Sequence, residues 1–315
     1  MTSTPPRVHA MRGISLIELM VSLVIGLIIV LAAVSAYIGA AGAGRVAEAQ
    51  GRMNEDAQMA LTILTENFRM AGSNPARPNR APVSLHNPLS NPFVVRGCDV
   101  QFSNAAGTTP AANTAALNCA HTATSTGPDA ISISYEADVF NTLPTSTNNP
   151  TDCTGGSTKS STQTITADNG TTANITVYEA ENRFYVGTST TILTPSLWCK
   201  GNGSSAQQPL VENVEDLQIL YGTSNPAITP TAVIGYMNAY QLENDATTLG
   251  ALSLVQKWSA VSTVRICILI RSNDNLASNA ASAQYYDCNG NLVTNPPDLR
   301  LRKAYSTTVV LRNMQ

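Results

Sequence analysis

The sequence predicts an α+β fold, in which one long N-terminal helix packs on an antiparallel β-sheet domain. An uncharged apolar run over residues 19–44 continues into an amphipathic segment. After that segment, short stretches rich in Val, Ile and Tyr follow one another without helical periodicity between them. Strands in series without intervening helices favour an antiparallel sheet. We therefore expect a polar leader at 1–13, a helix at 14–72 and a β-rich domain at 73–315.

The apolar run is long enough to cross a membrane. Its roughly 26 residues would rise about 39 Å as a helix at ~1.5 Å per residue, which exceeds the ~30 Å hydrocarbon core. Arg7 and Arg12 make the preceding segment positive, and a positive flank favours the cytoplasmic side. We expect a transmembrane segment at about 19–43, with an exported domain after it.

Glu18 is the unusual residue here, because a carboxylate inside a membrane costs ~2.5–3.5 kcal/mol on insertion scales and needs a partner. A secretory signal would be cut after its apolar core, and the small residues at 40–44 offer such a site. A long core with an acid near its start disfavours that reading. If the chain is instead cut between Gly13 and Ile14, a new α-amine appears four residues before Glu18. That amine can neutralise Glu18 within one helix or on a neighbouring subunit, and both pairings remain open.

The segment Gly13-Ile14-Ser15-Leu16-Ile17-Glu18-Leu19 resembles the type IV prepilin cleavage and N-methylation motif. The resemblance implies that a prepilin peptidase cuts after Gly13 and methylates the new amine of Ile14. It also implies that Glu18 pairs with the N-terminus of a neighbouring subunit during assembly. Major pilins usually have Phe where this chain has Ile14, which favours a minor pilin or a pseudopilin. A plain single-span anchor is the alternative.

Beyond the apolar run, the helix is predicted to continue as an amphipathic half. Apolar residues recur at three- and four-residue steps, with charged residues between them. The pattern ends at Ala71-Gly72, before Ser73-Asn74-Pro75, which is a stop signal for a helix. The apolar positions expected to pack against the domain are Val46, Ala49, Met53, Ala57, Ala60, Leu61, Leu64 and Phe68.

The domain is predicted to begin with a Pro-rich link at about 75–92. Segments 104–128 and 141–173 are rich in Thr, Ser, Asn and Ala and are interpreted as long loops. A hairpin is predicted around Ala180-Glu181-Asn182. The strand candidates are residues 93–95, 130–135, 162–166, 175–179, 183–186, 216–221, 261–271 and 302–311.

The cysteines indicate disulfides rather than a metal site. All six lie beyond the apolar run, none forms a CxxC pair, and the chain has only three histidines, so an ordinary zinc site is not expected. An even number in an exported domain favours disulfides, and six cysteines allow 15 connectivities. Six reduced, buried thiols are the alternative. We predict sequential pairing, because each pair then closes a short local loop: Cys98–Cys119, Cys153–Cys199 and Cys267–Cys288.

Stretches of the C-terminal half resemble the PilW-type minor pilins. The resemblance implies a minor pilin that initiates type IV pilus assembly at or near the pilus tip, in pili that serve twitching motility and cell adhesion. The stretches are Val211-Glu212-Asn213-Val214-Glu215-Asp216-Leu217-Gln218-Ile219-Leu220-Tyr221-Gly222, Trp258-Ser259-Ala260-Val261 leading into Val264-Arg265-Ile266-Cys267-Ile268-Leu269-Ile270-Arg271-Ser272, and Thr307-Thr308-Val309-Val310-Leu311-Arg312-Asn313.

This family resemblance also implies partners and a location. The partners are other minor and major pilins, the prepilin peptidase, the inner-membrane assembly platform and a tip adhesin. The locations are the bacterial inner membrane, spanned once by the helix with the domain in the periplasm, and the extracellular pilus.

No catalytic or cofactor-binding pattern accompanies these features. The chain contains no nucleotide loop, nucleophile elbow or metal helix motif, so we expect neither an enzyme nor a cofactor. Asn273-Asp274-Asn275 lacks the spaced ligands of a calcium loop and is interpreted as a turn. The formal net charge of −3 gives no basis for binding nucleic acid. Four acids without a nearby histidine are interpreted as solvated surface: Asp152, Asp168, Glu179 and Glu181.

Three other functions remain open. A pseudopilin of a type II secretion system would share the processing motif, the helix and the sheet, and only the C-terminal stretches favour the pilus. An adhesin or DNA-uptake pilin would bind a ligand, but uptake needs a basic stripe, and Lys159, Arg183 and Lys200 are too sparse to form one. A membrane-tethered enzyme is disfavoured because no catalytic constellation is evident.

Overall fold

The computed structural model describes residue 13 and residues 15–74, 93–102, 117–166, 170–203, 206–225 and 229–314. The predicted leader up to residue 12, Ile14 and the Pro-rich link at 75–92 lie outside the described residues, as do parts of both predicted loops. The chain divides into two compact units, residues 1–50 and 51–315, which we describe one at a time.

The first unit consists of most of the long helix α1 (Leu16–Met70), which begins three residues after Gly13. Every described side chain from 15 to 40 is exposed, and the great majority of them are apolar. By length and composition, this helix contains a segment able to cross a membrane. An exposed apolar surface of this extent requires lipid or another protein to cover it.

In the second unit, α1 presents one buried face to the domain. Its buried residues recur every three or four positions, as the sequence predicted for Met53, Ala57, Ala60, Leu64 and Phe68. Leu61 is half-buried beside them. Burying a Leu or Phe side chain contributes roughly 1.5–3 kcal/mol, so this stripe fixes the helix on the domain.

α1 ends as predicted, beside Gly72. This glycine has a φ of 70°, in the left-handed region that ends many helices. The N–H of Ala71 donates to the carbonyl oxygen of Asn67 at 3.0 Å, and the N–H of Gly72 donates to the carbonyl oxygen of Ser134 at 3.0 Å. The second bond ties the helix end directly to β2 (Ala130–Ala137).

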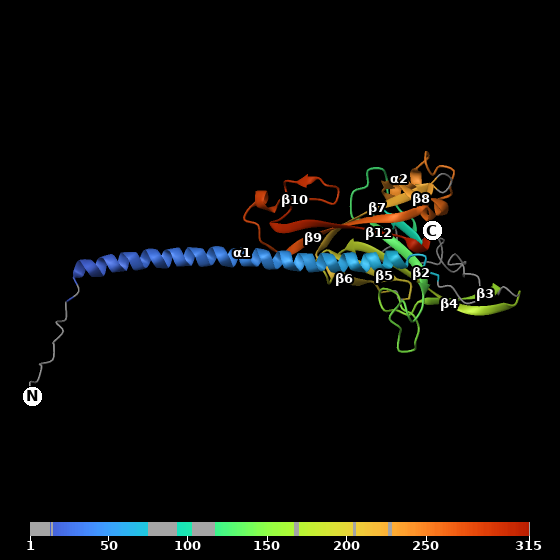
Figure 1. The fold of residues 1–315 in the computed structure, drawn as a ribbon, viewed down its shortest axis with the longest axis horizontal. Helices are drawn as coiled ribbons and strands as arrows, with labels where there is room; N and C mark the ends of the chain where they lie inside the picture. Colours follow the sequence, from blue (N-terminus) through green and yellow to red (C-terminus); the bar gives the residue numbers. More distant parts are fainter. Residues whose placement is uncertain are drawn as a thin grey trace, which may run out of the picture. The chain divides into compact units, whose positions relative to one another are not determined.

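The strands form two main antiparallel sheets (Figure 1). The first has the order β1-β2-β4-β5-β6, with β3 paired to the first half of β4, before the residues that pair with β5. Its strands are β1 (Val95–Cys98), β2, β3 (Lys159–Thr166), β4 (Thr172–Gly187), β5 (Ser196–Gly201) and β6 (Gln208–Glu212).

The second sheet has the order β12-β9-β7-β8. Two short helices, α2 (Ala239–Asn244) and α3 (Leu254–Ser259), lie between β8 and β9 in the chain. The β10–β11 pair (Tyr285–Tyr286 and Leu292–Val293) lies between β9 and β12 in the chain. The strands of the second sheet are β7 (Val214–Asn225), β8 (Thr229–Met237), β9 (Val261–Asn275) and β12 (Arg300–Val310).

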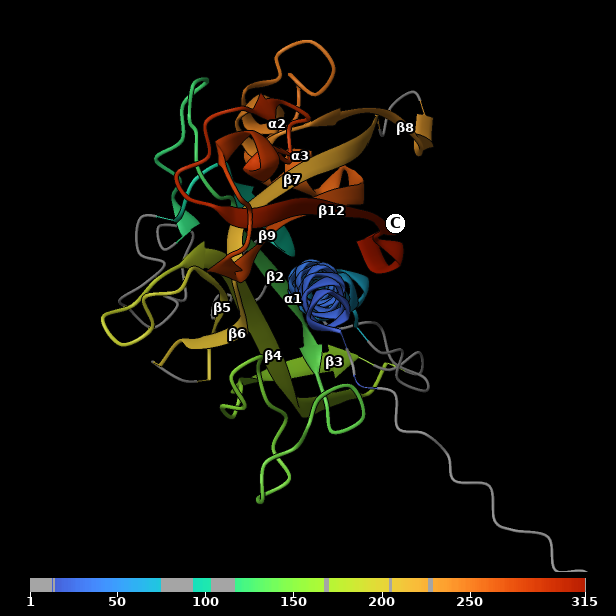
Figure 2. The same cartoon turned by 90° about the vertical axis from the view of Figure 1, so that its left-hand side faces the viewer.

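The part of α1 from Gly51 onward lies between these two sheets (Figure 2). One hydrophobic core joins the helix to both of them: Leu64 and Phe68 belong to the same buried cluster as Phe184 of β4 and Ile266 of β9. The predicted α+β class with an antiparallel sheet domain is confirmed. The domain differs from the expectation in having two main sheets, one on each side of the helix.

The predicted hairpin around Ala180 is wrong. Residues 172–187 form one continuous strand, β4, which pairs with β3 near its start and with β2 and β5 further on. Ala180 and Asn182 are buried within this strand. The chain turns earlier, near Gly170, whose φ of 81° is accessible to glycine. The strands β5, β6, β8, β10 and β11 and the two short helices were not anticipated.

A buried chain of amides fixes the position of α1 against the first sheet. The Nδ2 group of Asn182 donates to Asn67 Oδ1 at 2.8 Å and to the Tyr135 hydroxyl at 3.2 Å. The Nδ2 group of Asn67 donates to the carbonyl oxygen of Ile63 at 2.9 Å, and the N–H of Cys153 donates to Asn182 Oδ1 at 3.0 Å. These bonds join the helix, two strands and a loop, so they favour a single docking position over others of similar apolar contact.

Replacing Asn67 with Ala should destabilise the domain by about 1–3 kcal/mol, because the buried amide of Asn182 then loses a partner. The better helix propensity of Ala offsets roughly 0.5 kcal/mol of that loss. The measurement is urea unfolding of the full chain, followed by the fluorescence of the buried Trp198 and Trp258.

Gln58→Ala is the matched control, because Gln58 lies on the exposed face of the same helix. Its free energy of unfolding should stay within about 0.5 kcal/mol of that of the parent chain. Equal unfolding midpoints for Asn67→Ala and Gln58→Ala would show that the amide chain does not stabilise helix docking.

Candidate assembly site

The predicted processing motif lies at the start of α1. Gly13 is exposed and non-helical, and the helix begins at Leu16. The backbone N–H of Ser15 donates to Glu18 Oε2 at 3.2 Å. Glu18 therefore occupies the first turn of the helix, where a carboxylate satisfies a free backbone N–H and interacts favourably with the helix dipole.

Glu18 has a local hydrogen bond but no ion partner within the described part of the chain. Its neighbour Ser22 instead bonds back to the helix, donating through Oγ to the carbonyl oxygen of Glu18 at 2.6 Å. The carboxylate is exposed, like the apolar residues around it. The local bond leaves the charge itself without compensation if the segment lies in a membrane.

The six cysteines form three disulfides, in the same pairs as the sequence analysis gave. The Cα–Cα distances are 5.6 Å for Cys98–Cys119, 6.4 Å for Cys153–Cys199 and 5.7 Å for Cys267–Cys288, which lie within the ordinary range for a disulfide. Cys199 belongs to β5 and Cys267 to β9, so two of the bridges fasten a loop onto a central strand. Each closes a loop and thereby restricts the unfolded chain.

A buried polar cluster lies beside the first disulfide. His121 Nε2 lies 3.3 Å from Glu243 Oε2, and Arg96 Nη2 lies 3.2 Å from Glu243 Oε1. Trp258 Nε1 donates to the same Oε1 atom at 3.0 Å. Burial alone would raise the pKa of Glu243, but the hydrogen bond from His121 and the charge of Arg96 hold it below its ordinary value. The cluster joins β1 to α2 and α3.

This cluster does not form a metal site. His121 lies close to the sulfurs of Cys98 and Cys119, and a histidine with two thiolates would suit zinc. Both sulfurs are joined in a disulfide, so neither is a thiolate. The remaining acid, Asp99, accepts the N–H groups of Ala239 and Tyr240 at 2.7 and 2.8 Å and caps α2.

Asp129 is a buried acid that joins the two sheets. Its Oδ2 accepts the N–H of Ile219 at 2.6 Å, and its own N–H donates to the carbonyl oxygen of Leu217 at 2.7 Å. Asp129 directly precedes β2, and both partners belong to β7. The pKa of its carboxyl is raised to about 8, mainly by burial; the hydrogen bond from the N–H of Ile219 opposes this shift, and the charges of Asp99 and Asp216 add to it.

Two of the acids interpreted as solvated surface are in fact buried. Asp152 accepts the N–H groups of Thr154 and Gly203 at 2.8 and 2.7 Å and so holds a turn against β5. Glu181 forms an ion pair with Arg183 on the same face of β4, with Arg183 Nε at 2.8 Å. The sequence did not reveal the role of Asp152 because its partners are backbone N–H groups. It did not reveal the role of Glu181 because a turn was predicted there, and Glu181 and Arg183 share a face only in a continuous strand. Asp168 lies outside the described residues.

Asn67 is another residue that the sequence analysis missed. It lies three positions after Leu64, so a polar residue at a core position was visible in the pattern. The arginines Arg69 and Arg312 carried no such signal. They come from opposite ends of the domain sequence and meet only in the fold.

Two family models match the chain. Residues 183–313 match the model described as type IV pilus-assembly protein W, PilW, and residues 9–34 match the prokaryotic N-terminal methylation motif. Among solved structures, a type IV-like pilin from Thermus thermophilus is similar at 11% sequence identity and a TM-score of 0.35, over 84% of this chain and 99% of that chain. No curated protein matches the chain.

These matches confirm the resemblance to PilW-type minor pilins. One match contains Gly13 and Glu18, and the other contains every C-terminal stretch that suggested the family. The two matches point to a structural protein of the type IV pilus that associates with other pilins and the pilus machinery. The apolar helix and the methylation motif fit a membrane-anchored pilin.

Replacing Asp129 with Asn should reduce the loss of stability between about pH 5 and pH 8. The native pKa of about 8 lies above the ordinary 3.8, so the native chain keeps a proton that the unfolded chain has lost. The stability from that proton is complete below about pH 4 and is lost as the pH rises to about 8, at about 1.4 kcal/mol per pKa unit. Asn is neutral throughout and can still accept the N–H of Ile219.

The measurement compares urea midpoints at the two pH values, with Glu66→Gln as the control. Glu66 is an exposed acid on α1, so this variant should keep the pH dependence of the parent chain. If Asp129→Asn and the parent lose the same stability between these pH values, the buried carboxyl is not the group responsible.

Proposed function

We propose that this chain, a type IV pilin with a PilW-type C-terminal region, is a minor pilin that initiates pilus assembly. It acts together with other minor pilins and is incorporated at or near the pilus tip. The observation that carries the proposal is the combination of the two family matches on one chain: the processing motif at 9–34 and the PilW region at 183–313. The first is shared by filament subunits in general, and the second favours the pilus-assembly role.

Processing is the first step that the residues support. The prepilin peptidase cuts after Gly13 and methylates the amine of Ile14. Gly13 lies outside the helix and is exposed, so a protease can reach the peptide backbone on its C-terminal side without first unfolding α1. A side chain at this position would have to fit the peptidase, and Gly presents none.

Glu18 then serves assembly. After cleavage, the new amine of one subunit neutralises Glu18 of its neighbour, which removes a charge penalty of ~2.5–3.5 kcal/mol in the membrane. Ser15 N–H holds the carboxylate near the start of the helix, at the position where an incoming amine can meet it. When the amine comes from a neighbour and not from the same subunit, only a neighbour in the correct axial position relieves the charge, so this pair also sets the subunit register.

The same proposal assigns a location and partners. The helix inserts the chain in the bacterial inner membrane, with the domain in the periplasm, and the assembled protein reaches the extracellular pilus. Its partners are other minor and major pilins, the assembly platform and a tip adhesin. A role in twitching motility or adhesion would follow from the pilus and not from a ligand site on this domain.

Two variants separate processing from assembly. Gly13→Leu should leave the leader uncut, because the bulky side chain blocks the peptidase, and the protein should run as a larger band. Glu18→Ala should be cut normally but should fail to assemble, because the neighbouring amine has lost its carboxylate. Glu48→Ala is the control, an acid of the same helix outside the apolar run. Normal cleavage of Gly13→Leu, or full piliation with Glu18→Ala, would contradict the corresponding role.

A clean deletion tests the function itself. Cells that lack the protein should have few or no surface pili and normal secretion, because priming fails before the filament grows. Surface pili on intact cells are counted by electron microscopy, and secreted proteins are compared in the same cultures. Normal pili with blocked secretion would assign the chain to a type II secretion pseudopilus, with the processing steps intact.

A further inference from the structure

The second sheet has one long, regular edge. Among the described strands β12 pairs only with β9, and the pairing runs without a register shift from Arg302 to Val310. The other edge of the sheet, β8, is irregular, because two register shifts interrupt its pairing with β7. Proteins commonly block an edge strand with irregularities or charges, since a free edge pairs with any extended chain. The C-terminal part of β12 has neither.

The free groups on this edge can be identified. The N–H of Leu311 donates to Ser262 O at 2.9 Å, across toward β9. N–H and C=O groups of alternate residues point to opposite sides of an antiparallel strand, so those of Thr308 and Val310 turn away from β9. No hydrogen bond from the described residues reaches them.

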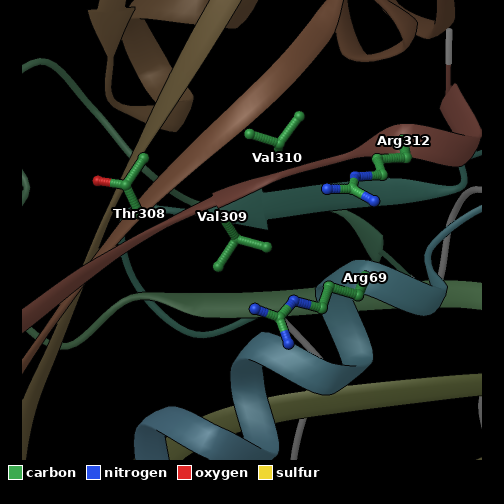
Figure 3. A pocket seen from close by; sticks show the side chains of 5 residues that line it. All are labelled: Arg69, Thr308, Val309, Val310 and Arg312. Carbon is green, nitrogen blue, oxygen red and sulfur yellow. The ribbon is translucent and has the colours of Figure 1, made fainter.

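Two arginines face this stretch of edge. A pocket of about 420 Å³ is lined by Arg69, Thr308, Val309, Val310 and Arg312. Arg69 comes from the last turn of α1 and Arg312 directly follows β12, and Figure 3 shows both guanidinium groups turned toward the end of the strand. Neither has an ion partner in the described part of the chain, and no acid lines the pocket.

The backbone beneath both arginines is fixed. The Nδ2 group of Asn313 donates to the carbonyl oxygen of Arg69 at 2.9 Å, which joins the last turn of α1 to the segment after β12. Leu311 between them is fully buried. These contacts position the backbone of both arginines beside the edge. The two positive side chains repel each other, so their mutual interaction does not hold them there.

The surroundings define what the edge can bind. The unpaired N–H and C=O groups suit an extended peptide backbone, which adds to a sheet as a further strand. Two guanidinium groups suit a carboxylate, which they bind through paired N–H donors. Val309 is buried on the α1 side of the strand, and the half-exposed Val310 lies on the other side. The ligand should thus carry acids facing α1 and apolar residues on the opposite side.

We propose that the end of β12, with Arg69 and Arg312, is a docking site for an extended, acid-bearing segment of another pilin subunit. The segment adds as a fifth strand to the β12-β9-β7-β8 sheet. That the partner is a pilin rests on the proposed function. That the site binds an extended, acid-bearing peptide rests only on the free edge and the two arginines.

The test uses the full chain in detergent micelles and a synthetic peptide of ten residues. The peptide is capped at both ends, alternates Val and Thr, and has two Thr positions replaced with Glu; a matched peptide has Gln there instead. Fluorescence anisotropy should give at least tenfold tighter binding for the Glu peptide. The double variant Arg69→Gln, Arg312→Gln should bind both peptides equally. Lys303→Gln, an exposed charge on the same strand outside the pocket, should change binding less than twofold.

Backbone pairing needs its own readout. Val310→Pro removes an N–H to which no described residue bonds and should weaken binding of the Glu peptide at least tenfold. Amide hydrogen exchange on the parent chain avoids any folding defect of that variant: peptide binding should slow exchange at Thr308 and Val310.

Three results would overturn the proposal. They are equal affinity for the two peptides on the parent chain, binding that leaves exchange at Thr308 and Val310 unchanged, and displacement of the peptide by single-stranded DNA at a lower concentration than by unlabelled peptide. The last would assign the arginines to nucleic acid. Because purified protein is used, a negative result here leaves the deletion experiment, and the pilus role that it tests, standing.

Discussion

The buried face of α1 from Met53 to Phe68 is the surface on which both sheets are assembled. Ala57 and Ala60 are fully buried there. Leu64 and Phe68 belong to the same buried cluster as Ile133 and Phe184 of the first sheet and Ile266 of the second. Because one helix face serves both sheets, neither sheet retains its apolar covering without the helix. The domain should therefore fold as one cooperative unit.

The polar interior of the domain adds positional specificity to this apolar contact. Asn67 and Asn182 fix the helix on the first sheet, and Asp129 joins the first sheet to the second. In the second sheet, Arg302 lies between Glu215 of β7 and Asp298, with its Nη1 2.7 Å from Asp298 Oδ1. Each polar group is matched by a partner from a different element, so a shifted sheet would leave buried groups unpaired at about 1–3 kcal/mol each. Apolar burial drives association, and these bonds select one arrangement.

The sequence predicted the features that depend on local pattern. The helix, its stripe and its end at Gly72 follow from periodicity and one glycine, and the processing motif is a contiguous segment. The prediction failed at Ala180-Glu181-Asn182, where polar residues suggested a turn but pairing on both sides keeps β4 straight. It also missed β8, in which Pro230 and Gly235 interrupt the strand formers Val233, Ile234 and Tyr236. Arg69 and Arg312 could not be connected, because the contact between Arg69 and Asn313 joins residues 244 positions apart.

The two charges with proposed roles in subunit contact lie at opposite ends of the same helix, each where the helix itself favours it. Glu18 is in the first turn of α1 and Arg69 in the last. An acid at the N-terminal end and a base at the C-terminal end each gain about 0.3–1 kcal/mol from the helix dipole. That gain supports an ionised group without neutralising it, unlike a salt bridge within the chain. At Glu18 the gain offsets only part of the ~2.5–3.5 kcal/mol cost of a charge in the membrane, so each group keeps a charge that a neighbouring subunit can pair.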